Sequence, residues 1–172
     1  FERKVKILKK IPITWIATNN FILSRIKKSK IYSNNHSSKV IFLGIEHERF
    51  KSCSKSFARK KLMIKNSKQV ILFGCSDFSD LRKGSYIINS VMKEINKSGL
   101  KLENILLLTF GEINDFKMEN HNIEWKHMGT ISSPKTMNLL YRSSDIMINT
   151  SIDDLGPTII QETFLNDVFL IS

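Results

Sequence analysis

Short apolar runs alternate with amphipathic segments from residue 70 to the end of the chain. The first run, at residues 70–74, is apolar without interruption, which is typical of a strand that is buried on both faces. We expect strands at residues 70–74, 105–108, 123–128, 145–149 and 168–171. We expect helices between them, after Gly84 and over residues 134–141 and 157–165. Alternating strands and helices predict an α/β fold with a doubly wound parallel sheet, which is Rossmann-like.

The pattern is less regular before residue 70. Residues 11–17 are predicted to be extended, and residues 39–43 to form a strand. A short amphipathic helix is expected over 20–28, with apolar positions that would serve as a core face or as a membrane anchor. A linker is expected at 44–50, followed by a basic helix near 54–62.

Ligands bind to doubly wound sheets beyond the carboxyl ends of the strands, so the loops that follow the strands are candidate sites. The last of these loops carries Asp154, and Glu162 follows in the next helix. Gly156 and Pro157 can start that helix, which would leave the amides of Thr158 and Ile159 free to face a phosphate. The carboxylates could accept hydrogen bonds from sugar or ribose hydroxyls. The plain alternatives are a helix cap for Asp154, an exposed helix position for Glu162 and an ordinary turn between them.

Two other loops carry candidate groups. Arg82 and Lys83 precede Gly84 at a helix start, where the two cations could neutralise a diphosphate; the alternative is a solvated surface pair. In the run from His127 to Ile131, the backbone at Gly129 and Thr130 could contact a nucleotide base, or it could form a simple turn.

Charge is unevenly distributed along the 172 residues. Residues 1–70 hold 18 Lys and Arg against 3 Asp and Glu, a balance of +15, whereas the rest hold 9 against 13, a balance of −4. The basic part could face an anionic membrane or a nucleic acid, or form a solvated surface. It does not interleave aromatic residues with cations as surfaces that bind single strands do, so no nucleic acid partner is expected.

The remaining features limit the class of protein. No apolar run reaches the roughly 20 residues of a membrane span. Cys53 and Cys75 fit no metal-site spacing, and we expect reduced thiols, no metal and no cofactor in a cytoplasmic protein, with attachment to the inner face of the membrane left open. The chain starts without Met and ends in an apolar run, so we expect a fragment of a longer protein.

Taken together, these residues resemble the family 4 glycosyltransferases of the GT-B type. The resemblance rests on the Arg82-Lys83-Gly84 loop, the Met128-Gly129 turn, the run from Leu140 to Asp145, and the spacing of Asp154 and Glu162. It implies that residues 1–43 end an acceptor domain, 44–51 form an interdomain linker, and 52–172 form a truncated nucleotide-sugar domain. Capsule- and colanic-acid-type members share an Asp-x-Arg-Lys-Gly loop, so the resemblance extends to them.

The resemblance implies retaining transfer of a sugar from a nucleotide diphosphate sugar to a sugar or lipid-linked hydroxyl acceptor in surface polysaccharide synthesis. Asp154 would contact the donor sugar and Glu162 the ribose, while Lys83 and Arg82 would stabilise the leaving diphosphate. The chain departs from the family pattern in three places. Asp154 replaces a usual Glu, Cys75 stands where many members have an Arg, and residues 166–169 replace a Cys-Gly-Thr-Pro turn. These departures motivate the alternative of a non-catalytic nucleotide-binding or scaffold module.

Overall fold

The computed structural model describes residues 1–46, 48, 50, 53–114, 116–119, 122–154 and 158–172. Its contacts divide the chain into two compact units, of which the first comprises Phe1–Gly44 and the second comprises Ile45–Asp154 and Ile159–Ser172. The predicted linker at 44–51 lies partly outside the described residues.

The first unit contains helix α1 (Glu2–Leu8), strand β1 (Ile13–Ala17), helix α2 (Asn20–Lys28) and strand β2 (His36–Val40). The two strands pair in parallel, with Ile13 opposite His36. The strand expected at 39–43 is therefore shifted toward the N-terminus, and α1 was not predicted at all. The shift has a physical reason, because the buried His36 ring accepts a hydrogen bond from Trp15 Nε1 at 3.0 Å and its Nε2 lies 2.9 Å from the Leu8 carbonyl oxygen. A polar residue thus fills an inward-facing strand position.

The second unit contains the predicted sheet of five parallel strands. The strands are β3 (Gln69–Asp77), β4 (Ile105–Glu112), β5 (Glu124–His127), β6 (Ile146–Ile148) and β7 (Phe169–Ile171), in the order β5-β4-β3-β6-β7. The doubly wound α/β prediction is confirmed. β3 runs three residues past the predicted strand, through a bulge between Gly74 and Asp77.

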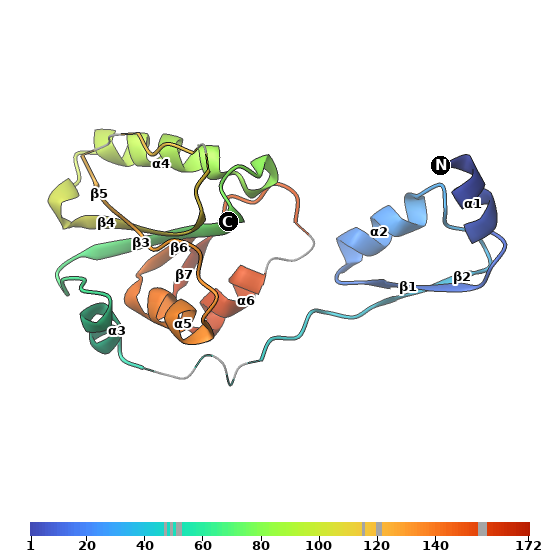
Figure 1. Ribbon diagram of the computed structural model, residues 1–172, viewed down its shortest axis with the longest axis horizontal. Helices are drawn as coiled ribbons and strands as arrows, with labels where there is room; N and C mark the ends of the chain where they lie inside the picture. Colours follow the sequence, from blue (N-terminus) through green and yellow to red (C-terminus); the bar gives the residue numbers. More distant parts are fainter. Residues whose placement is uncertain (47, 49, 51–52, 115, 120–121, 155–157) are drawn as a thin grey trace. The chain divides into compact units, whose positions relative to one another are not determined.

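Helices cover both faces of this sheet (Figure 1). Helix α4 (Ser85–Lys97) lies on one face, whereas α3 (Lys55–Lys61), α5 (Pro134–Ser143) and α6 (Thr158–Leu165) lie on the other. Strand β3 contributes alternate side chains to the two cores. Val70 and Leu72 pack with Leu140 and Tyr141 of α5, while Ile71 and Phe73 pack with α4. Both sets are almost completely buried, which explains why the strand is apolar from Val70 to Phe73.

The strand order places a topological switch point between β3 and β6. The chain leaves β3 toward β4 on one side, and later returns to β6 on the other. In doubly wound sheets a ligand binds in the crevice at this point, beyond the carboxyl ends of the two strands. The loops concerned are residues 78–84 after β3 and 149–154 after β6, which are the loops that carry Lys83 and Asp154.

Candidate functional site

Lys83 and Asp154 form an ion pair across the switch point. Lys83 lies in a single turn of 3-10 helix, η2 (Leu81–Lys83), and its Nζ is 2.5 Å from Asp154 Oδ2. The side chains retain 25% and 18% exposure, so they are shielded yet reachable by a ligand. In partly buried surroundings such a pair is screened less than on the surface. Residues 71 positions apart are thus joined in one charged centre.

The backbone around this pair is fixed by hydrogen bonds between the two loops. Thr150 Oγ1 donates to the carbonyl oxygens of Lys83 and Gly84, at 2.8 and 2.9 Å, and the Ile152 amide donates to the Arg82 carbonyl oxygen at 2.8 Å. Gly84 has a left-handed φ of 65°, and a Cβ there would lie 2.2 Å from the Thr150 carbonyl oxygen. Only glycine allows this approach. The loops are therefore held at a fixed separation.

Arg82 points to a different partner. Its Nε and one terminal nitrogen donate to the two carboxylate oxygens of Asp80, at 3.1 and 2.6 Å, and its side chain is 68% exposed. The hydrogen bonds from Arg82 hold the pKa of Asp80 below its usual value. The structure thus separates the two predicted cations, because Lys83 faces the acidic loop whereas Arg82 is paired within its own turn.

Glu162 is held by a buried tyrosine. Tyr141 of α5 is fully buried, and its hydroxyl donates to Glu162 Oε2 at 2.7 Å. Burial, together with the adjacent Glu162 carboxylate, raises the pKa of Tyr141, so the hydroxyl keeps its proton. Sequence reasoning missed this contact, although a buried tyrosine hydroxyl requires a partner. Among the described residues, no hydrogen bond or ion pair given by the structure joins Glu162 to Lys83 or Asp154.

Replacing Tyr141 by Phe is expected to lower the free energy of unfolding by about 1 to 2 kcal/mol. The ring still fills its cavity, but the carboxylate loses a hydrogen bond that is only partly replaced by water. Urea unfolding measures the change. Tyr86→Phe is the control, because Tyr86 is half exposed and its variant is expected to stay within about 0.5 kcal/mol of the parent. Equal stability of the Tyr141 variant and the parent would show that the contact carries no free energy.

The other predicted ligand-binding residues are only partly described. Thr158 and Ile159 are the first two residues of α6, and Thr158 is exposed. Gly156 and Pro157 lie outside the described residues. Gly129 has a left-handed φ of 68°, and its carbonyl oxygen accepts a hydrogen bond from the Gly111 amide at 2.9 Å. Thr130 follows it on the surface, after the carboxyl end of β5.

Cys75 lies at the end of β3 on the edge of the same site. Burial raises the pKa of its thiol to about 11, and the positive charge of Lys83 opposes this shift. The thiol therefore stays neutral at physiological pH and gives no charge to bind a phosphate.

In the part of the chain that the structure describes, no group of His, Cys, Asp and Glu is arranged to hold a metal ion. The helices described there are also too short or too polar to cross a membrane.

Comparison with solved structures assigns the fold. No protein-family model matches the chain, and no curated protein sequence matches it. A sucrose-phosphate synthase from Thermosynechococcus elongatus has a TM-score of 0.73 and 15% identity, with 99% of this chain and 43% of that one covered. A glycosyltransferase from Rickettsia africae has a TM-score of 0.73 and 18% identity, and the match covers 99% of this chain and 47% of that one. The Anabaena protein HepE, solved with UDP and glucose, has a TM-score of 0.72 and 14% identity, and the match covers 98% of this chain and 46% of that one.

These relatives are GT-B glycosyltransferases, and this chain has the fold of a GT-B C-terminal domain together with the first, smaller unit. It spans less than half the length of each of the three. The fold prediction is therefore confirmed. The resemblance to capsule- and colanic-acid-type members stays a prediction.

Proposed function

We propose that this chain supplies the donor-binding part of a retaining glycosyltransferase that moves a sugar from a nucleotide diphosphate sugar to a hydroxyl acceptor in surface polysaccharide synthesis. The observation that supports it best is the Lys83–Asp154 pair at the switch point of the sheet. The solved complexes of HepE with UDP and glucose, and of a pneumococcal O-GlcNAc transferase with UDP and GlcNAc, add weight to a nucleotide-sugar donor.

In this proposal the ion pair opens when the donor binds. Lys83 leaves Asp154 and donates to the diphosphate, so its charge stabilises the phosphate oxygen that becomes negative as the glycosidic bond breaks. Asp154 then accepts hydrogen bonds from the hydroxyls of the donor sugar. Glu162, fixed by Tyr141, accepts hydrogen bonds from the ribose. Arg82 adds long-range positive charge, which is weaker because the side chain is exposed and paired with Asp80.

The remaining assignments extend the same proposal. The turn at Gly129 and Thr130 contacts the base, and the α6 start, with Gly156, Pro157, Thr158 and Ile159, approaches the phosphates. Residues 1–43 end an acceptor domain, 44–51 form the linker, and 52–172 form the donor domain. The acceptor is a sugar or lipid-linked hydroxyl, and the protein works in the cytoplasm.

A calorimetric titration with UDP, GDP and ADP, without metal, tests the proposal. We expect one of the three to bind in preference to the others, and Glu162→Gln to weaken that binding about tenfold, since a hydrogen bond to a charged group contributes about 1.5 kcal/mol or more. The matching 2′,3′-dideoxynucleotide should bind equally to the parent and to the variant, because it lacks the hydroxyls that Glu162 would hold. No binding of any of the three nucleotides would overturn the proposal.

A non-catalytic nucleotide-binding or scaffold module is the second candidate, and the neutral Cys75 thiol at the site favours it. Such a module would bind the nucleotide with the same dependence on Glu162 but would not transfer sugar. Turnover of a nucleotide sugar by a protein that joins this chain to a complete acceptor domain would exclude the second candidate.

A further inference from the structure

Helix α3 and the turn that follows it form a basic surface with protruding apolar side chains. Residues 54–68 hold six Lys and Arg and no Asp or Glu. Three of the six form ion pairs, since Lys55 and Arg59 contact Asp145 and Lys68 contacts Glu124. The other three, Lys60, Lys61 and Lys65, are exposed, and the structure gives them no acidic partner among the described residues. Their positive charge is therefore directed to solvent.

The apolar side chains stand among these lysines. Phe57 is 49% exposed and lies under Lys61, whose Nζ is 5.6 Å from the centre of the ring. Met63 is 85% exposed at the turn after α3. Lys60 and Lys61 follow Phe57 by three and four positions, so they share the outer face of α3 with it, while Ala58, Arg59 and Leu62 are buried on the inner face. The outer face of the helix therefore combines an aromatic ring with two positive charges.

The exposed Met63 also has an unfavourable backbone conformation. Its φ is 53°, in the left-handed region that a residue with a Cβ occupies at a cost of about 1 kcal/mol. Neither burial nor packing compensates for this cost in the chain itself. A glycine would satisfy the backbone better, so the folded chain alone gives no reason for a large apolar side chain here.

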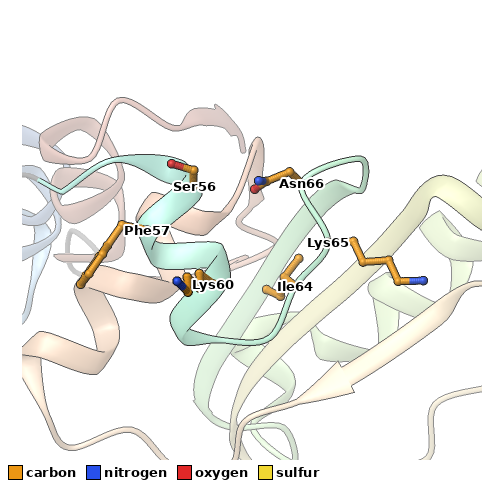
Figure 2. Close-up of a pocket in the computed structure, with 6 residues that line it drawn as sticks. All are labelled: Ser56, Phe57, Lys60, Ile64, Lys65 and Asn66. Carbon is orange, nitrogen blue, oxygen red and sulfur yellow. The ribbon is translucent and has the colours of Figure 1, made fainter.

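An open pocket lies on the same surface. Its volume is about 500 Å³, and it is lined by Ser56, Phe57, Lys60, Ile64, Lys65 and Asn66. Figure 2 shows Ile64 in the centre of the group, with Phe57 and Lys65 on opposite sides of it. An apolar floor with cations at its margin suits an acyl chain and an anionic headgroup better than a fully polar ligand. Residues 62–68 precede β3 and so lie at the amino ends of the strands, whereas the donor loops lie at the carboxyl ends; occupancy of this surface therefore leaves the donor site open.

We propose that the α3 surface, defined by Phe57, Lys60, Lys61, Met63 and Lys65, docks on a membrane that contains anionic lipid. The lysines would attract the anionic headgroups, and Phe57 and Met63 would enter the interface between headgroups and acyl chains. Each lysine near such a surface contributes to binding, and the apolar contacts add to the affinity. This inference concerns a surface apart from the donor site and does not depend on the proposed transferase activity.

Co-sedimentation of the 172-residue chain with lipid vesicles tests the inference. We expect binding to vesicles of equal parts phosphatidylcholine and phosphatidylglycerol, and little binding to phosphatidylcholine alone. The triple variant K60Q/K61Q/K65Q is expected to bind about a hundredfold more weakly, since each lysine contributes a factor of about five. K93Q/K101Q/K135Q removes the same charge from exposed positions elsewhere in the second unit and should keep most of the binding.

Met63→Gly separates docking from folding. The variant should be more stable to urea than the parent, because it relieves the left-handed backbone, yet it should bind vesicles several-fold more weakly.

An equal loss of vesicle binding in the two triple variants would overturn the inference in favour of general charge attraction, and full binding by K60Q/K61Q/K65Q would place attachment elsewhere. Tight binding to duplex RNA or DNA with none to vesicles would also overturn it. Nucleotide binding is measured separately, so failure here leaves the donor-site proposal intact.

Discussion

Replacing Lys83 by Met is expected to weaken binding of the preferred nucleoside diphosphate about tenfold to a hundredfold. Lys83 is the partly shielded cation at the switch point, and loss of a hydrogen bond between charged groups costs about 1.5 to 3 kcal/mol. Methionine keeps the length of the side chain, so the loss reports the charge. Calorimetry on the parent and the variant measures the ratio of the two dissociation constants.

Arg82→Met is the matched control for this experiment. It removes the same charge from the adjacent residue, but Arg82 is exposed and already paired with Asp80. We expect a loss of about threefold or less, because an exposed ion contributes little. A larger loss in the Arg82 variant than in the Lys83 variant would contradict the assignment of Lys83 to the diphosphate. In that case the turn would have to rearrange when the nucleotide binds.

Much of the fold could be predicted from the sequence because the strands of the second unit are nearly pure apolar runs. Strand β3 packs on both faces, so each of its residues from Val70 to Phe73 had to be apolar. The first unit was harder. Its strand β2 begins with His36, whose buried ring is satisfied by Trp15 and Leu8, and no local pattern indicates such partners. Helix α1 buries no residue, so it carries little of the periodic signal that marks a packed helix.

The candidate site was predictable only as a set of loops. The rule that ligands bind beyond the carboxyl ends of strands placed Lys83 and Asp154 in candidate loops, but the contact between them depends on the strand order. Which cation faces Asp154 also could not be predicted, because Arg82 and Lys83 are adjacent and differ only in the direction of their side chains. The Tyr141–Glu162 contact likewise joins two helices, and the spacing of residues along the chain does not reveal such a contact.

The largest effect on stability is expected from Arg59→Met. Arg59 is 4% exposed and donates to the carbonyl oxygens of Ser143 and Asn66 and to Asp145 Oδ2, at 2.9, 2.8 and 2.8 Å. These bonds join α3 to the turn that follows it, to the end of α5 and to the residue before β6. Methionine would leave the carbonyl oxygens of Ser143 and Asn66 without this donor and would remove one of the two cations that contact Asp145, so we expect the free energy of unfolding to fall by about 3 kcal/mol. Lys61→Met on the exposed face of α3 is the control and should change it by less than about 0.5 kcal/mol.

The same network makes the stability depend on acid. Burial alone would raise the pKa of Asp145, but hydrogen bonds from Lys55 and the Val70 amide, with the charge of Arg59, bring it below its usual value. A carboxyl whose pKa is lower in the folded chain stabilises the fold fully above its unfolded pKa, about 3.9, and loses this effect as the pH falls through the folded pKa. Asp145→Asn should therefore destabilise the chain at neutral pH, and the difference from the parent should shrink below about pH 4. Urea unfolding across this range measures it. If the difference in unfolding free energy between the parent and the variant stayed constant into acid, the variant would be destabilised by something other than the loss of the Asp145 charge.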